Sequence, residues 1–129
     1  MKNFYFLIFT VFFFITTSSL SAQAQEETNY LKVIALSLPE QYIKSNSELF
    51  FTIQIGAYKN ENKTLETLDN VATTKEGILT KYRLGEFSTY EEAVEYKNML
   101  LSVCNDAFIV SIKNGERIHI TEALKLGAI

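Results

Sequence analysis

The chain has 129 residues, of which 47% are hydrophobic and 21% charged, and its formal net charge is −3. This length allows one domain of ordinary size, and the single Cys and single His exclude a disulfide framework, a Cys-based metal cluster and a zinc site built on paired His. The mildly acidic balance also argues against a nucleic-acid partner.

The first 24 residues have the pattern of a secretory signal peptide. Lys2 precedes an almost entirely apolar run, Phe4–Ile15, and a small polar stretch leads to Ala22-Gln23-Ala24, the kind of ending that signal peptidase requires. We predict cleavage after Ala24, which removes one positive charge and takes the net charge from −3 to −4. The alternative is an uncleaved anchor, but this run reaches only about 18 Å, against a hydrocarbon core of roughly 30 Å. We therefore predict an exported, periplasmic chain with no membrane span after cleavage.

The lead-in segment, residues 25–48, is polar around one apolar stretch, Tyr30–Leu38, which Pro39 closes. The pattern of this stretch fits a short strand or a helix equally well. The folded domain is predicted over residues 49–122, with a tail over residues 123–129.

The domain begins with a predicted strand and helix. Apolar and polar residues alternate over Phe51–Ile55, which is typical of a half-buried strand. After a polar turn, the apolar residues from Leu65 to Ala72 fall at helical spacing, and Gly77 is available as a stop.

A second strand and helix follow the first pair. The alternation returns over Lys81–Leu84, and Ser88-Thr89-Tyr90-Glu91 forms a capping box in which Ser88 and Glu91 each satisfy a free backbone N–H. The helix ends at Asn105-Asp106. Its buried stripe is predicted to consist of Ala93, Tyr96, Leu100 and Val103.

The end of the domain reads as a hairpin and a short helix. Ala107–Lys113 predicts a third strand, and Asn114-Gly115 is a tight turn into Glu116–Ile120. Thr121–Leu126 adds a short helical piece.

The two strand–helix units repeat each other. Ile53–Tyr58 and Tyr82–Phe87 share the pattern apolar, polar, aliphatic, Gly, any residue, aromatic, and each is followed by a turn and a helix. The repeat predicts an α+β fold in which both helices cover one face of a sheet and leave the opposite face open.

Alternation along the strands assigns side chains to these two faces. The residues predicted to lie under the helices are Ile53, Ile55, Tyr82 and Leu84. The residues turned toward the open face are Thr52, Gln54, Lys81 and Arg83. In the third strand we expect Phe108, Val110 and Ile112 inward, and Ile109, Ser111 and Lys113 outward.

The predicted open face carries hydroxyl, amide and basic groups with little carboxylate, which reverses the acidic balance of the whole chain. Such groups suit sugar hydroxyls, N-acetyl groups and carboxylates. The alternative is that these residues are simply solvated. The chain has no Trp to stack on a sugar, and the alternation turns Tyr82 inward.

Two motifs in this region resemble those of a known family. Phe51–Tyr58 (FTIQIGAY) resembles the opening strand of the SPOR (sporulation-related repeat) domain, which reads aromatic-T-V-Q-V-G-A-F. Lys81–Phe87 (KYRLGEF), followed by Ser88–Ala93, resembles the second signature, basic-V-x-V-G-x-F and S-x-x-E-A. Phe108–Val110 is similar to the closing strand of the family.

The resemblance covers about residues 49–120. It implies an RNP-like βαββαβ fold, an antiparallel sheet with two helices on one face, that binds peptidoglycan and prefers glycan strands stripped of their stem peptides. Gln54 matches the first-strand Gln of the family, and Lys81 stands where an Arg is usual, without its planar fork. Arg83, on the same face, can compensate. The predicted glycan-binding residues are therefore Gln54, Lys81, Arg83, Thr52 and Ser111.

We find no nucleophile–base–orienter combination, and we predict a non-catalytic protein without a cofactor or metal site. Cys104 is expected to be a small buried residue and His119 a structural or solvated one. The leading hypothesis is a module of the bacterial cell envelope that binds peptidoglycan glycan strands. The alternative is an envelope protein–protein interaction module that docks its partner through Tyr30–Leu38 or the sheet face. RNA binding is disfavoured by the export signal, the net charge and the absence of outward aromatics for stacking.

Overall fold

The structure is a computed structural model that describes residues 26–127. The predicted signal peptide lies outside this range. Within residues 26–127, no helix combines the length and the apolar character that crossing a bilayer demands.

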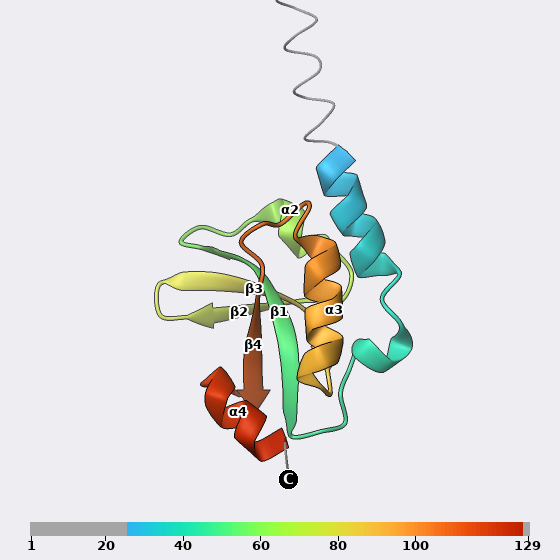
Figure 1. Cartoon of the computed structure of the whole chain (residues 1–129). Helices are drawn as coiled ribbons and strands as arrows, with labels where there is room; N and C mark the ends of the chain where they lie inside the picture. The colour runs from blue at the N-terminus through green and yellow to red at the C-terminus, as the bar shows by residue number, and fades with distance from the viewer. Residues whose placement is uncertain (1–25, 128–129) are drawn as a thin grey trace, which may run out of the picture.

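Five antiparallel strands form one sheet in the order β2-β3-β1-β4-β5. Their bounds are Leu49–Tyr58 (β1), Val71–Glu76 (β2), Leu79–Phe87 (β3), Phe108–Lys113 (β4) and Glu116–Ile118 (β5). The sheet is strongly curled, so that β2 and β3 run across β1 and β4 at a steep angle (Figure 1). The α+β fold class predicted from the sequence is confirmed.

The helical segments are residues 26–36, the 3₁₀ turn Glu40–Tyr42 (η1), Lys63–Glu66 (α2), Tyr90–Leu100 (α3) and Ile120–Gly127 (α4). Their buried apolar residues form one core with β1 and β3 residues that include Ile53, Tyr82 and Leu84. As predicted, these three strand residues face the core, and all three are completely buried.

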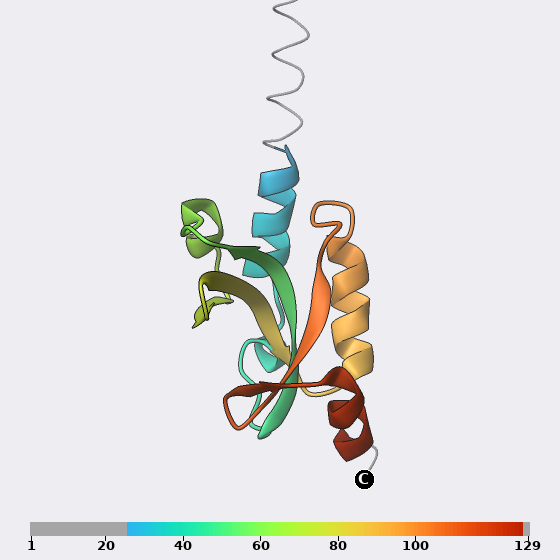
Figure 2. The same ribbon diagram turned by 90° about the vertical axis from the view of Figure 1, so that its left-hand side faces the viewer.

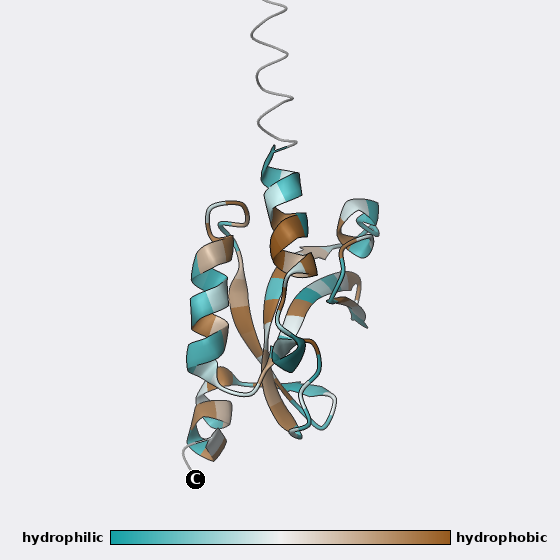
Figure 3. Ribbon diagram, turned by 90° about the vertical axis from the view of Figure 1, so that its right-hand side faces the viewer, coloured by the Kyte–Doolittle hydropathy of each residue, from teal (hydrophilic) through white to brown (hydrophobic). Residues whose placement is uncertain are grey.

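The apolar stretch of the lead-in segment is part of a helix that completes this core. Leu31, Ile34, Ala35 and Leu38 recur at the spacing of one helix face, and each is at most 7% exposed. The helix lies between α2 and α3 (Figures 2 and 3). Asn70 donates from Nδ2 to the carbonyl oxygen of Ala35 at 2.8 Å, which satisfies one of the free carbonyls at the helix end. The folded domain therefore begins well before residue 49.

The helix predicted from Leu65 to Ala72 is wrong over most of its length. After the single turn of α2, Asn70 adopts a left-handed conformation (φ 61°), so the helix cannot continue through this residue. The carbonyl oxygen of Asn70 accepts a hydrogen bond from the Gly85 N–H. The residues that follow include Val71, Thr73 and Thr74, which are β-branched and favour an extended backbone. They form β2, an edge strand, and Gly77 (φ 61°) turns the chain into β3.

The start of α3 lies one residue later than predicted. Thr89, not Ser88, is the N-cap: its hydroxyl oxygen accepts the Glu92 N–H and the hydroxyl donates to the Glu92 carboxylate at 2.7 Å. Ala93 and Leu100 are fully buried, as predicted, whereas Tyr96 is half-buried and Val103 follows the end of the helix.

The predicted faces of β4 are reversed. Phe51 pairs with Ser111 and Ile53 with Ile109, which puts Ser111 and Ile109 on the helix side of the sheet; Lys113 shares their face. Phe108, Val110 and Ile112 consequently lie on the opposite face, with Gln54, Thr52 and Phe50. By its own pattern, the wholly apolar set of Phe108, Val110 and Ile112 would face the core, because the other set contains Ser111 and Lys113. The register with β1 decided the opposite facing.

The hairpin and helix at the end of the chain agree with the prediction. Asn114 (φ 51°) and Gly115 (φ 82°) both have the positive φ of a two-residue hairpin turn. The helical piece is α4, which spans the predicted boundary between the domain and its tail, and its Ala123 is completely buried in the core.

Because the N-terminal helix packs on the core with one face, Ala substitutions at two neighbouring residues should change the free energy of unfolding by different amounts. Ile34→Ala should lower the free energy of unfolding by roughly 2–4 kcal/mol, because it leaves a cavity in the core. Val33→Ala, at a position that is 58% exposed, should change it by less than about 0.5 kcal/mol. Urea unfolding of the mature chain, residues 25–129, measures both. Equal small effects would mean that the helix does not dock.

Candidate functional site

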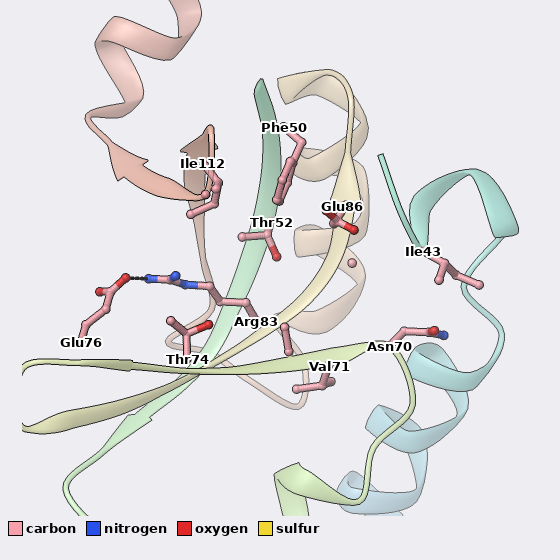
Figure 4. A pocket seen from close by; sticks show the side chains of 13 residues that line it. Ile43, Phe50, Thr52, Asn70, Val71, Thr74, Glu76, Arg83, Glu86 and Ile112 are labelled. Atoms are coloured by element: carbon pink, nitrogen blue, oxygen red, sulfur yellow. Dashed lines mark hydrogen bonds and ion pairs between the residues drawn. The ribbon is translucent and has the colours of Figure 1, made fainter. Parts of the chain in front are cut away.

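The curled sheet forms a groove of about 480 Å³ on the face that is turned away from the core. Side chains from four strands reach it, as Figure 4 shows. The residues that define its floor and walls include Phe50 and Thr52 from β1, Thr74 and Glu76 from β2, Arg83 and Glu86 from β3, and Ile112 from β4. Ile43, from the loop before β1, closes one end.

Arg83 is the central polar group of this groove. It is directly opposite Gln54 on β1, and its Nε donates to Gln54 Oε1 at 3.3 Å while its Nη2 donates to Glu76 Oε1 at 2.7 Å. Arg83 is only 6% exposed and Gln54 4%. A buried guanidinium requires such partners, so these contacts fix its orientation.

Glu76 places a carboxylate between two cations of this face, Arg83 and Lys81. Besides its bond to Arg83, it forms an ion pair with Lys81 Nζ at 3.5 Å. Burial by itself raises the pKa of Glu76, but the hydrogen bond and charge of Arg83, together with Lys81, lower it overall. The expectation of a face with little carboxylate is therefore wrong, because the sequence reading placed Glu76 at the end of a helix and not in a strand.

Four of the five predicted site residues share the groove face, and Ser111 does not. Thr52 lines the groove, but its hydroxyl donates to the Leu84 carbonyl oxygen at 3.2 Å and the residue is 3% exposed. Ser111 is 1% exposed on the helix side, where its hydroxyl donates to the Ile118 carbonyl oxygen at 2.8 Å. Ser111 is thus a structural residue of the β4–β5 hairpin, and we remove it from the candidate site.

Phe108 is a site residue that the sequence reading missed. It lies directly opposite Gln54 on the groove face and is 42% exposed. The guanidinium of Arg117, on β5, lies 5.9 Å from the centre of its ring, within the range of a cation–π contact. Its signal in the sequence is an aromatic residue next to the apolar Ile109, since consecutive residues of a strand point to opposite faces and one of the two must face away from the core.

Arg83, Gln54 and Phe108 stand in one row across three adjacent strands. Neighbouring strands are about 4.8 Å apart, so the row spans roughly 10 Å. It offers a cation, an amide and an aromatic ring along a direction perpendicular to the strands.

Glu86 is a second carboxyl group of the groove. Burial raises its pKa above the ordinary value, although the Ser45 backbone N–H and the charge of Lys44 act in the opposite direction. Since Ser45 and Lys44 belong to the loop before β1, Glu86 ties that loop to the end of the groove.

The single Cys and His lie elsewhere. Cys104 is half-buried against the core, and burial raises the pKa of its thiol. His119 accepts the Thr121 N–H at its Nδ1 and thereby helps to begin α4. Within residues 26–127, no three His, Cys, Asp or Glu side chains gather as metal ligands would. The groove groups described above can form hydrogen bonds, ion pairs and ring contacts with a ligand.

Comparison with family models, curated proteins and solved structures found no match to this chain.

The Glu76 ion pairs predict a pH-dependent contribution to stability. Because its pKa in the folded state lies below the ordinary value of 4.5, ionised Glu76 stabilises the fold at neutral pH, and this contribution is lost as the pH falls through the folded-state pKa. Glu76→Gln should lower the free energy of unfolding at pH 7 by about 1 kcal/mol, a modest value because its side chain is 32% exposed.

At pH 3 the same substitution should have a smaller effect, because protonation of Glu76 removes the charge that the substitution removes. Urea unfolding at the two pH values measures the difference, with Glu95→Gln on the exposed side of α3 as the matched control. An equal loss at both pH values would contradict an electrostatic role for Glu76.

Proposed function

We propose that this chain is an exported, non-catalytic module of the bacterial cell envelope that binds the glycan strands of peptidoglycan on the sheet face that carries the groove. The observation that carries this proposal is the row of Arg83, Gln54 and Phe108. A pyranose ring has an apolar face of C–H groups and a rim of hydroxyl and N-acetyl groups, and the row provides a partner for each.

Each member of the row has a distinct role. The exposed ring of Phe108 would stack on the apolar face of one sugar. The amide of Gln54 is both a donor and an acceptor, and the guanidinium of Arg83 has more N–H groups than its two bonds to Gln54 and Glu76 use. Because Gln54 and Arg83 are already buried and paired, binding would cost little side-chain entropy. The mixed apolar and polar lining is also what ligand-binding grooves usually have.

The resemblance to the SPOR family supports the same function. From β1 to β4 the elements follow one another as strand, the single turn of α2, two strands, α3 and a strand, which supports the βαββαβ fold that the resemblance implies. Gln54, Lys81 and Arg83 share one face of the sheet, as the resemblance leads us to expect. Two features depart from that pattern. The first crossover helix is reduced to the single turn of α2, and Glu76 pairs with both cations.

The cellular location rests on the leader. A signal peptide over residues 1–24 would deliver the mature domain to the periplasm, where peptidoglycan is present.

A second candidate function, protein–protein interaction in the envelope, rests on the outer side of the N-terminal helix. Tyr30, Val33 and Leu36 are 45%, 58% and 63% exposed, although the opposite side of this helix is packed in the core. Retention of a crosslinked partner after digestion of the wall with muramidase would favour this candidate.

Cosedimentation of residues 25–129 with peptidoglycan tests the proposed function. The protein should pellet with sacculi, and Phe108→Ala should weaken binding about fivefold to tenfold, the effect of losing one ring contact. Leu124→Ala, which removes a residue that is also 42% exposed but lies on α4, should bind like the unaltered chain. Absence of pelleting with both intact and amidase-stripped sacculi would refute the function, and undiminished binding by Phe108→Ala would place the site elsewhere.

A further inference from the structure

Arg117 is an exposed cation on the same sheet face as Phe108, outside the groove around Arg83. It lies directly opposite Ile112 of β4, and two residues that are paired in this way share a face of the sheet. Phe108 is four residues before Ile112 on β4 and shares its face. Because the guanidinium of Arg117 lies 5.9 Å from the centre of the Phe108 ring, the side chain of Arg117 must extend along β4 toward that ring.

The charge of Arg117 has no counter-charge in the fold. Lys81 and Arg83 share the carboxylate of Glu76, whereas no carboxylate of residues 26–127 lies within ion-pair distance of Arg117. The neighbouring Glu116 pairs with Lys113 in the register of the hairpin and therefore lies on the opposite face. A guanidinium stays ionised throughout the physiological pH range. Arg117 thus offers a full positive charge beside an aromatic ring.

This combination of ring and cation suits a sugar that carries a carboxylate. A sugar that packs on the exposed part of the Phe108 ring, which is 42% exposed, brings the substituents of its own ring close to Arg117. The cation–π contact holds the guanidinium at this place before the ligand arrives. Its planar fork can donate two parallel hydrogen bonds to a carboxylate, and such charge-assisted bonds are roughly twice as strong as neutral ones.

We infer that Arg117 binds a free carboxylate on the sugar that stacks on Phe108, and that this contact determines which glycan strands the chain prefers. The inference rests on the proposed function and adds a specificity residue to it. In peptidoglycan, the carboxylate is the lactyl group of a sugar whose stem peptide has been removed. Arg117 is in neither of the two motifs that resemble the SPOR family. The preference for stripped strands is thereby assigned to an attraction by charge, and not to the space that a missing peptide leaves.

The test separates the carboxylate from the missing peptide. One probe is soluble glycan strands stripped of peptides, and the other is the same strands after conversion of their lactyl carboxylates to methylamides, which removes the charge and keeps the strands free of peptide. Residues 25–129 should bind the first probe about fivefold more tightly at about 50 mM NaCl. The difference should fall below about twofold at about 500 mM NaCl, because salt screens a contact between exposed charges. Isothermal titration calorimetry measures the affinities.

Arg117→Gln should remove this discrimination. It should bind the stripped strands about fivefold more weakly than the unaltered chain at low salt and bind the methylamide strands within about twofold. Arg117→Lys should keep part of the discrimination, because it retains the charge without the planar fork. Lys113→Gln is the matched control, since it removes one positive charge from the same hairpin on the opposite face of the sheet, and it should behave like the unaltered chain.

The outcomes distinguish the inference from the proposed function. Equal affinities of the unaltered chain for the two probes would overturn the inference and leave the function in place. The inference would also be wrong if Arg117→Gln still discriminated between the probes, or if it bound both of them equally weakly. Binding of neither probe by the unaltered chain would overturn the function and the inference together.

Discussion

The groove depends on the burial of one guanidinium group. Arg83 lies on the central part of the sheet with 6% exposure, and a charge in that position must be paired. Its two partners, Gln54 on β1 and Glu76 on β2, come from the strands on either side of β3. The same contacts join three neighbouring strands and compensate the positive charge of Arg83.

Docking of the N-terminal helix, residues 26–36, explains why residues 71–76 form the strand β2 of this groove and not a longer helix. Since α2 is a single turn, it covers little of the sheet, and the helix of residues 26–36 supplies the missing apolar cover. Gly85 allows the close approach: it has a φ of 71°, and a Cβ there would lie 3.1 Å from Leu38 Cδ2. Residues 71–76 are therefore free to form β2, which brings Glu76 to Arg83.

Much of the site could be predicted from local pattern. Alternation over Phe51–Ile55 and Lys81–Leu84 is unambiguous, with apolar residues on one side only, and it assigns Thr52, Gln54, Lys81 and Arg83 to one face. In β4 alternation misleads, because it turns the wholly apolar set that includes Phe108 toward the core and Ser111 toward the site, whereas the pairing with β1 does the reverse. Helical spacing misleads between Leu65 and Gly77. The apolar residues there are spaced as in a helix, but the segment forms a turn and the edge strand β2.

The sequence by itself determined the α+β class, the strands β1 and β3 with their inward and outward residues, and the hairpin at Asn114-Gly115. These features depend on neighbours in the chain, whose spacing and turn chemistry act locally. Only the tertiary structure decided the facing of β4, the docking of the N-terminal helix and the pairing of Glu76 with Arg83 and Lys81. Those are settled by register and packing between segments far apart in sequence, and they bring the carboxylate of Glu76 to a face that the sequence predicts to be basic.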